Sequence, residues 1–260
     1  MKKDTVLEKN VIDLYNSGIK NRKAIAKKLG RNYSSIFYVM KRLGLDNDEK
    51  EPYKVDEAFF EDINSEQKAY LLGIMYSDGC VHNNTMIIGV SDKEIVDNAK
   101  VFLDYEGPIE ISKQKEYKPI YKLRVRRKKI FNDLVMKGCS PNKSLTLKFP
   151  EVNIVPVDQL NNFIRGIFDG DGCISYSEKY DKWTISITGT KEILDGIRNN
   201  IIGIHGCLRQ ATSNNTWRLM LQSPHDISKF INYIYKNATV SLTRKRILCE
   251  RFLKEYNESN

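Results

Sequence analysis

Apolar residues recur every three or four positions in three short runs within the first 45 residues, and a glycine follows each run: Gly18, Gly30 and Gly44. This spacing is typical of amphipathic helices, and a glycine after the last apolar position is a common helix stop. The pattern predicts a small domain of three short helices over residues 1–45. The apolar stripes are Val6, Val11, Leu14 and Tyr15; Ile25, Ala26 and Leu29; and Ile36, Val39, Met40 and Leu43.

The second and third of these helices have the spacing of a helix-turn-helix, in the positions of Ala26, Gly30 and Ile36. That motif needs a small residue where the helices cross, a glycine in the left-handed turn and an apolar anchor on the second helix. Eight basic residues and no acid lie from Lys20 to Arg42, which favours DNA binding over a plain three-helix bundle.

In this interpretation the third helix enters the major groove, and basic residues beside it contact phosphates. The residues directed toward the groove are expected to be Arg31, Asn32, Tyr33, Ser34, Ser35 and Tyr38. The expected phosphate contacts are Lys27, Lys28, Lys41 and Arg42.

Residues 46–64 reverse the charge of this segment. Nine acidic residues lie from Leu45 to Glu66 against two lysines, and Pro52 interrupts the stretch. This composition predicts a linker between the basic domain and the rest of the chain. The alternative is an acidic surface segment of the following domain, with a short helix around Val55–Ile63.

The remaining sequence contains an internal repeat. The segment Tyr70–Val81 returns as Phe163–Ile174, with identical pairs at Gly73/Gly166, Ile74/Ile167, Asp78/Asp171, Gly79/Gly172 and Cys80/Cys173. Lys93–Ile95 likewise matches Lys191–Ile193, and Ser144–Thr146 matches Ser241–Thr243. Copies of about 95 residues indicate a duplicated domain rather than a solenoid, with units at residues 65–150 and 151–260.

Each unit changes between helical and strand periodicity in the order helix, two strands, helix, two strands, helix. This αββαββα order predicts an α+β fold of two units packed side by side. The expected strands include Thr85–Ser91, Tyr121–Arg127, Thr184–Thr188 and Trp217–Gln222. The expected helices between them are Lys93–Leu103, Lys129–Met136, Lys191–Ile201 and Asp226–Tyr235.

The composition of the chain indicates the kind of partner that it binds and the cellular compartment in which it is expected. The 260 residues carry 42 basic and 33 acidic side chains, a net charge of +9, which indicates a polyanionic partner. Five cysteines without a CxxC pair argue against a disulfide framework or a zinc knuckle. The polar start of the chain is no signal peptide, and no apolar run reaches the ~18 residues of a membrane-spanning helix. We expect a soluble, cytoplasmic protein.

The repeated motif places small residues one helical turn apart, as Gly-x3-Ser in the first copy and Gly-x3-Gly in the second. Two helices can approach nearly backbone to backbone along such stripes, which would bring Asp78 and Asp171 together. Two close carboxylates repel unless they share a proton or a cation, and Mg²⁺ with retained waters suits them. An aspartate before a glycine is also an ordinary helix-ending turn, but its recurrence in both copies favours a shared site.

At these residues the chain resembles the LAGLIDADG homing endonucleases. Ile164–Gly172 is a close match to their motif, Leu71–Gly79 is a looser one, and the likeness covers roughly residues 65–255. The resemblance implies a pseudo-two-fold monomer whose antiparallel sheets form a saddle over a long double-stranded DNA site. The earlier motif acid is Asp169 in the second copy but Tyr76 in the first. That position is usually structural in the family, so the difference bears on helix packing more than on catalysis.

The resemblance also implies a metal-dependent cut of both strands across the minor groove, which leaves short 3′ overhangs. The last acid of each motif, Asp78 and Asp171, would be catalytic and bind Mg²⁺ or Mn²⁺. The backbone carbonyls of Ser77 and Gly170 would help to hold the metal.

Strand alternation supports the saddle. In Tyr121–Arg127, the basic residues Lys122, Arg124 and Arg126 lie on one face and apolar residues on the other. A basic face backed by an apolar one suits a sheet in a DNA groove, with a solvated sheet face as the plain alternative. Further candidates for DNA contact are His82, Asn84, Ser175, Ser177 and Arg218, together with Lys143 and Lys245 beside the catalytic site.

Three functions are compatible with these features. The first is a site-specific DNA endonuclease whose helix-turn-helix lengthens the recognised sequence. The second is a non-catalytic transcriptional repressor derived from an endonuclease, and the third is an RNA-binding intron maturase. Retention of both aspartates favours the nuclease, because a pure binder gains nothing from two carboxylates beside DNA phosphates. The sequence leaves open the target site, the host and whether the gene lies in an intron.

Overall fold

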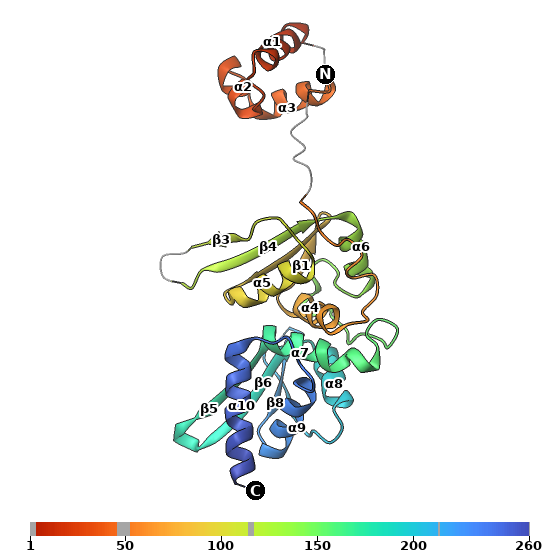
Figure 1. Cartoon of the computed structure of the whole chain (residues 1–260), viewed down its shortest axis with the longest axis vertical. Helices are drawn as coiled ribbons and strands as arrows, with labels where there is room; N and C mark the ends of the chain where they lie inside the picture. Colours follow the sequence, from red (N-terminus) through yellow and green to blue (C-terminus); the bar gives the residue numbers. More distant parts are fainter. Residues whose placement is uncertain (1–3, 46–52, 114–116, 213, 260) are drawn as a thin grey trace. The chain divides into compact units, whose positions relative to one another are not determined.

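The computed structural model describes residues 4–45, 53–113, 117–212 and 214–259 (Figure 1). The chain divides into two compact units, Met1–Tyr53 and Lys54–Asn260, and each has its own hydrophobic core. Among the helices of the described ranges, none is long and apolar enough to cross a membrane.

The first unit is the three-helix domain that the apolar runs predict. Its helices are α1 (Thr5–Asn16), α2 (Arg22–Leu29) and α3 (Tyr33–Arg42). Gly18, Gly30 and Gly44 follow them with φ of +94°, +57° and +66°, a backbone region that glycine enters without strain. The core consists of Leu7, Val11, Ile25, Ala26, Ile36, Val39 and Met40.

The prediction that Val6 belongs to the first apolar stripe is wrong. Its side chain is 68% exposed, and Leu7 is the buried residue one turn before Val11. Residues four apart lie on the same helix face, whereas neighbouring residues point about 100° apart. The first helix therefore turns Leu7, not Val6, toward the core.

The predicted linker of residues 46–64 extends too far along the chain. Its residues 46–52 lie outside the described residues. Residues 54–64 belong to the second unit, where Phe59, Phe60 and Ile63 are buried in the core. This segment contains turns rather than the short helix considered for Val55–Ile63. Three buried apolar side chains thus anchor this acidic segment to the second unit. The charge pattern alone does not predict this anchoring.

The second unit contains the αββαββα order twice, as predicted. The first copy comprises α4 (Glu66–Ser77), β1 (Gly79–His82), β2 (Thr85–Val90), α5 (Lys93–Phe102), β3 (Glu110–Ser112), β4 (Ile120–Arg126) and α6 (Lys128–Met136). The second comprises α7 (Leu160–Asp171), β5 (Gly172–Ser177), β6 (Lys182–Gly189), α8 (Lys191–Asn200), β7 (Cys207–Gln210), β8 (Trp217–Leu221) and α9 (Pro224–Ile234). A long additional helix, α10 (Thr243–Glu258), follows the second copy.

Each copy forms one antiparallel sheet with an equivalent strand order. The orders are β1-β2-β4-β3 and β5-β6-β8-β7. In Figure 1 the sheets and their helices make two halves of this unit, with α4 and α7 where the halves meet. Every second residue of the central strands is buried, as in β2 with Met86, Ile88 and Val90. The other face of each sheet is left for polar side chains, which is the α+β arrangement that the sequence predicts.

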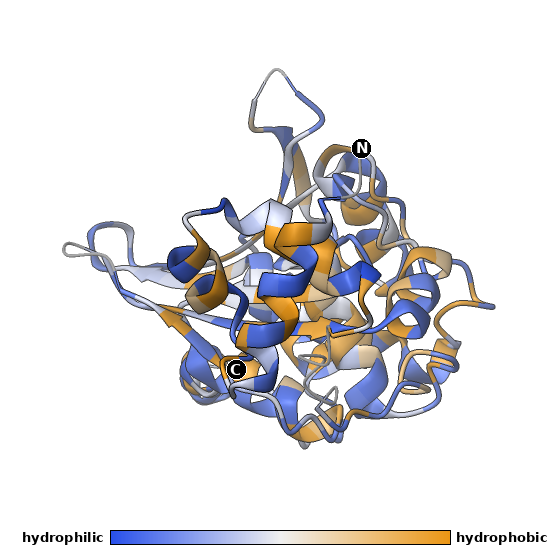
Figure 2. Ribbon diagram, turned by 90° about the horizontal axis from the view of Figure 1, so that it is seen from above, coloured by the Kyte–Doolittle hydropathy of each residue, from blue (hydrophilic) through white to orange (hydrophobic). Residues whose placement is uncertain are grey.

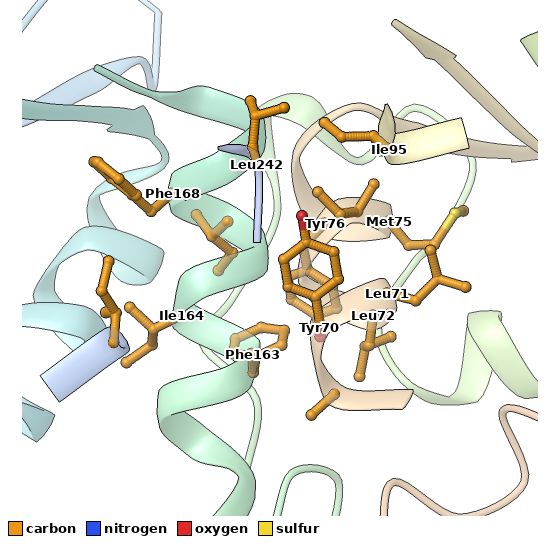
Figure 3. Packing of buried hydrophobic residues seen from close by; sticks show 14 of the residues in the cluster. Tyr70, Leu71, Leu72, Met75, Tyr76, Ile95, Phe163, Ile164, Phe168 and Leu242 are labelled. Carbon is orange, nitrogen blue, oxygen red and sulfur yellow. The ribbon is translucent and has the colours of Figure 1, made fainter. Parts of the chain in front are cut away.

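A single hydrophobic core runs through both halves. Figure 3 shows Leu71, Leu72 and Met75 of α4 pointing into the first half, and Ile164 and Phe168 of α7 pointing into the second. Each motif helix therefore packs into its own copy, as the motif sequence predicts. Figure 2 shows hydrophobic residues along the inner strands and helices, and mostly hydrophilic residues in the outlying loops.

Candidate functional site

Helices α4 and α7 touch backbone to backbone at their glycines. A methyl group added to Gly73 would overlap the carbonyl oxygen of Phe163 and lie 2.9 Å from the Cα of Gly166. A methyl group added to Gly166 would in turn overlap the carbonyl oxygen of Tyr70. Packed backbones leave no room for such atoms, so only glycine fits at either position. The predicted small-residue stripes therefore face each other.

Asp78 and Asp171 come together at the end of this helix pair. Asp78 is the C-cap of α4, and Asp171 is the last residue of α7. A methyl group added to Gly170 would lie 2.8 Å from Oδ2 of Asp78. Asp78 is half-buried and Asp171 is exposed. Two carboxylates from distant parts of the sequence thus open onto one accessible site.

Both carboxyl groups have raised pKa values. Surrounding protein atoms desolvate Asp78 and raise its pKa, and the charge of Asp92 acts in the same direction. Desolvation, followed by the charge of Asp78, raises the pKa of Asp171 to about 6, although one side of Asp171 remains open to solvent. The cations Lys143 and Lys245 partly offset both shifts. A bound divalent cation would stabilise such a carboxylate pair.

Lys143 and Lys245 lie beneath the two carboxylates as a structural pair. The Nζ of Lys143 donates to the last carbonyl oxygens of α4 at 2.9 and 3.5 Å. The Nζ of Lys245 donates to the last carbonyl oxygens of α7 at 2.6, 2.8 and 3.4 Å. A cation at this end of a helix satisfies free carbonyls and complements the helix dipole. Both lysines are buried, and burial lowers the pKa of each. Their contact with DNA beside the site stays a prediction.

The equivalence of the two lysines is not visible in the sequence repeat. Ser144–Thr146 matches Ser241–Thr243, yet Lys143 precedes the first segment and Lys245 follows the second. Lys143 begins a short 3₁₀ helix, Lys143–Leu145, whereas Lys245 lies in the first turn of α10. Each lysine therefore reaches its own motif helix by a different route, and the sequence match does not mark equivalent positions.

The motif position that differs between the copies holds a packing group in both. Asp169 is buried and accepts hydrogen bonds from the hydroxyl of Tyr70 at 2.9 Å and the N–H of Leu242 at 2.7 Å. Tyr76 is also buried, and its hydroxyl donates to the carbonyl of Lys137 at 2.6 Å. Both side chains tie a loop to a motif helix, as expected for a structural position.

The outer face of the first sheet carries the predicted basic side chains. Lys122, Arg124 and Arg126 alternate along β4 with fully buried apolar residues. Arg124 and Arg126 are exposed. Arg124 forms an ion pair with Glu110 of β3, with Nε and Oε2 3.0 Å apart. The basic face therefore exists, and a neighbouring strand compensates part of its charge.

The hairpin after the first motif places one residue differently from the prediction. His82 is the exposed last residue of β1, opposite Thr85 of β2. Asn84 lies in no strand, because Asn83 and Asn84 form a two-residue turn with φ of +46° and +58°. Asparagine tolerates this left-handed conformation and favours tight hairpin turns. The alternation that would place Asn84 beside His82 ends one residue earlier.

The outer face of the second sheet is lined mainly by hydroxyl groups. Ser175 of β5 is exposed and Ser177 is half-buried. Arg218 of β8 is exposed and lies opposite Thr188 of β6 and Arg209 of β7. These side chains share a surface with Lys182, which lies opposite Ser177. That surface therefore carries Lys182, Arg209 and Arg218, as many basic side chains as the outer face of β4, so the predicted lower basic content is not seen there.

In the first unit, the residues expected at a DNA groove gather around the start of α3. Tyr33 and Ser34 are exposed and Ser35 is half-buried. Arg31 and Asn32 precede α3 instead of lying in it, and Asn32 is its N-cap, with Oδ1 accepting from the N–H of Ser35 at 2.8 Å. Asparagine is favoured as an N-cap, which accounts for Asn32 without DNA. The phosphate-contact candidates Lys27, Lys28, Lys41 and Arg42 are exposed.

The oxygen atoms at the end of the helix pair suit Mg²⁺ or Mn²⁺. Within the described residues, no group of three or more histidine, cysteine, aspartate or glutamate side chains is placed to hold a metal ion. Mg²⁺ needs no such group, since one or two carboxylates, waters and substrate phosphates complete its octahedron. Asp78 and Asp171 supply the carboxylates. The carbonyls of Ser77 and Gly170 accept long hydrogen bonds from the two lysines, at 3.5 and 3.4 Å.

Two sequence comparisons identify relatives of part of the chain. The family model of the LAGLIDADG-like domain matches residues 158–235. The chain is also 26% identical over 130 residues to the probable translation initiation factor IF-2 of Methanocaldococcus jannaschii. That match covers 49% of this chain but only 11% of the archaeal protein. The chain thus spans a small fraction of this curated relative.

Solved structures share the fold of the second unit. The LAGLIDADG homing endonuclease I-LtrWI bound to target DNA matches with a TM-score of 0.50 and 14% identity, over 74% of this chain and 90% of that one. A double mutant of I-SmaMI matches with a TM-score of 0.50 and 12% identity, over 74% of this chain and 92% of that one. The N-terminal LAGLIDADG domain of DUF199/WhiA matches with a TM-score of 0.46 and 17% identity, over 73% of this chain and 92% of that one. Residues 158–235 therefore match the LAGLIDADG-like domain family, and the second unit as a whole has the fold of the LAGLIDADG homing endonucleases.

Proposed function

We propose that the chain is a site-specific endonuclease of double-stranded DNA that uses Mg²⁺ or Mn²⁺ held by Asp78 and Asp171. The observation that carries this proposal is the meeting of two partly desolvated carboxylates, one from each copy, at the end of the glycine contact. A protein that only bound DNA would be weakened by these charges, because they repel each other and the DNA phosphates.

The proposed reaction is the hydrolysis of one phosphodiester bond in each strand. The metal, held by Asp78, Asp171 and the carbonyls of Ser77 and Gly170, would supply an activated water and stabilise charge at the phosphate. The oxygen of water forms a bond to phosphorus, the bond to the 3′ oxygen breaks, and that oxygen takes up a proton. The two buried lysines hold the helix ends that carry these ligands.

DNA is the partner that best suits the outer faces of the sheets. The net charge of +9 favours a polyanion, and Lys122, Arg124 and Arg126 give β4 a basic surface. Ser175, Ser177 and Arg218 would contact DNA from the second sheet. A neighbour of the same fold, I-LtrWI, is a homing endonuclease solved on its target DNA, which supports the same use of the sheets here.

The first unit would lengthen the recognised sequence as a helix-turn-helix. Its three key positions fit this motif, since Ala26 and Ile36 are buried and Gly30 has a φ of +57°. In this proposal α3 would enter a major groove with its exposed N-terminal residues. The proposed contacts are Lys27, Lys28, Arg31, Tyr33, Ser34, Ser35 and Lys41.

The function is tested by a cleavage screen with the full-length protein. Plasmids that carry the gene's own locus and a randomised library are incubated with Mg²⁺, and the DNA ends are sequenced. We expect a discrete site, cut in both strands with short 3′ overhangs, and no cutting in EDTA. Specific DNA binding without cleavage would instead support a repressor, and preferential RNA binding would support a maturase.

Substitution of the two aspartates tests the assignment of the site. Asp78→Asn or Asp171→Asn is expected to lower the cleavage rate at least ~100-fold while DNA affinity persists, because the metal loses a carboxylate ligand. Asp97→Asn is the matched control, since Asp97 is paired with Lys93 on the outer side of α5. A site variant that cuts both strands as fast as the control would refute the assignment.

A further inference from the structure

The two flanks of the proposed catalytic centre differ, although they occupy equivalent places in the two copies. In each copy the N-cap residue of the helix after the second strand lies beside the centre. This residue is Asp92 before α5 and Thr190 before α8. An acid and a hydroxyl at the same position create unequal surroundings for the two motif aspartates.

Charged side chains fill the flank beside Asp78. Asp92 accepts two hydrogen bonds from Arg244, one from Nε and one from Nη2, each 2.8 Å long. Glu94 accepts hydrogen bonds from the N–H and the hydroxyl of Thr243, at 3.0 and 2.5 Å. Bidentate pairs of this kind have a fixed geometry. The start of α10 is therefore fastened to the first copy across this flank.

The flank beside Asp171 is open. Thr190 donates its hydroxyl to the carbonyl of Leu147 at 2.6 Å and accepts from the N–H of Ile193 at 3.2 Å. A cavity of about 250 Å³ lies here, lined among others by Asp171, Lys143, Ser144 and Thr188. The hydroxyl groups of Ser144 and Thr188 suit the oxygens of a phosphate. The same position on the other flank is taken by the ion pair of Asp92 and Arg244.

We propose that the two DNA strands are cut in a fixed order, which rests on the endonuclease function proposed above. The strand whose phosphodiester enters the cavity beside Asp171 is cut first. The Asp92–Arg244 ion pair fills the opposite flank and delays the second cut. Each cut adds one water across one phosphodiester, leaving a 3′-hydroxyl and a 5′-phosphate, so the order changes no other product.

The experiment follows each strand separately. A supercoiled plasmid with the site found in the screen is cut under single-turnover conditions with Mg²⁺, and labelled duplexes show which strand breaks. We expect the same strand to break first, at least about fivefold faster than the other, with nicked circles accumulating. Duplexes already nicked in one strand give the rate for each remaining strand by itself.

Two variants should move the two rates in opposite ways. Asp92→Thr with Arg244→Ala gives the first flank the residue of the second, so the slow cut should accelerate and the ratio approach one. Ser144→Phe fills the open cavity and should slow only the fast cut. Lys254→Ala is the control, because Lys254 lies near the end of α10 and pairs with Glu258 away from both flanks.

The results separate this inference from the function on which it depends. Equal rates for both strands in the wild-type protein would overturn the fixed order. An unchanged ratio in the Asp92→Thr, Arg244→Ala variant, measured on pre-nicked duplexes that it binds, would overturn the role of the ion pair. A wild-type protein that cuts no DNA at all would instead refute the endonuclease proposal, and the strand order with it.

Discussion

The two motif helices have the same backbone contact and very different side-chain chemistry. On α4, the positions beside Gly73 in the motif hold Leu72 and Tyr76, both buried. On α7, the equivalent positions hold Arg165 and Asp169, also buried. One copy thus packs with apolar and aromatic groups where the other buries two charges.

The charges of α7 serve a connection that the first copy lacks. Nη1 of Arg165 donates to the carbonyl of Ile234 at 2.6 Å, and Nη2 pairs with Glu66. Glu66 also accepts from the N–H groups of Thr239 and Val240 at 2.8 and 3.1 Å. These bonds fix the segment that leads into α10. The two copies therefore share the glycines of the helix contact, whereas the side chains beside these glycines differ because they bind different loops.

The largest expected effect comes from disrupting the glycine contact that α4 and α7 share. In Gly166→Ala, the new methyl group would overlap the carbonyl of Tyr70 and meet the Cα of Gly73 at 2.9 Å. Backbone atoms of two buried helices cannot move aside cheaply, so we expect a loss of about 4 kcal/mol or more in the free energy of unfolding. Urea titration followed by circular dichroism measures it.

Gly89→Ala in β2 is the control for this variant. A methyl group there meets the side chains of Lys122 at 3.5 Å and Ile120 at 3.9 Å, which are ordinary contacts. We expect a change within about 1 kcal/mol. If both variants unfold at the same urea concentration, the close contact between α4 and α7 is not present in solution.

The sequence predicts those parts of the site that depend on short, repeated or periodic segments. The glycine stripes and the aspartates after them recur in both copies, and the strands show period-two alternation. Asp92 and Arg244, by contrast, are ordinary charged residues whose pairing depends on where α10 begins. Contacts between residues so far apart have no periodic signal. The order of elements was therefore predictable, whereas the unequal flanks of the site were not.

A smaller effect is expected from removing the buried charge of Arg165, which α7 has and α4 lacks. Arg165→Ala leaves Glu66 without its buried partner and the carbonyl of Ile234 without a donor, so we expect a loss of about 3 kcal/mol. Arg165→Met combined with Glu66→Gln removes both charges and should cost less than the single change. Leu72→Met at the equivalent position of α4 is expected to cost below about 1.5 kcal/mol.

Arg165→Met and Glu66→Gln are also made singly, and a double variant as unstable as the sum of these two would contradict the coupling of Arg165 and Glu66. Thermal unfolding at one pH and salt concentration measures all of these proteins together. The comparison also tests the lesson drawn from the two helices. If Arg165→Ala and Leu72→Met cost the same, then the buried charges of α7 have no special role in fastening the loop before α10.

The smallest expected effect is a gain of stability at the proposed catalytic centre. The folded pKa of Asp171 is raised to about 6, whereas an unfolded aspartate has a value near 3.9. A carboxyl group whose pKa is raised by folding stabilises the fold only while it is protonated. Its contribution to the free energy of unfolding is therefore complete below pH 4 and is lost as the pH rises through 6. Without metal at pH 7.5, Asp171→Asn should therefore be more stable than the wild type. Because Asp171 is exposed, solvent screens the shift, and we expect a gain of about 1 kcal/mol.

Melting temperatures in EDTA at pH 4.5 and pH 7.5 measure this gain, which should shrink or vanish at the lower pH. Addition of Mg²⁺ at pH 7.5 should stabilise the wild type and reduce the advantage of the variant, because a ligand that binds only the folded state raises its stability. Asp97→Asn, away from the centre, should show neither response. A variant less stable than the wild type in EDTA at pH 7.5 would mean that neither desolvation nor the charge of Asp78 disfavours the ionised form of Asp171. A shared metal would then have no unfavourable charge to compensate.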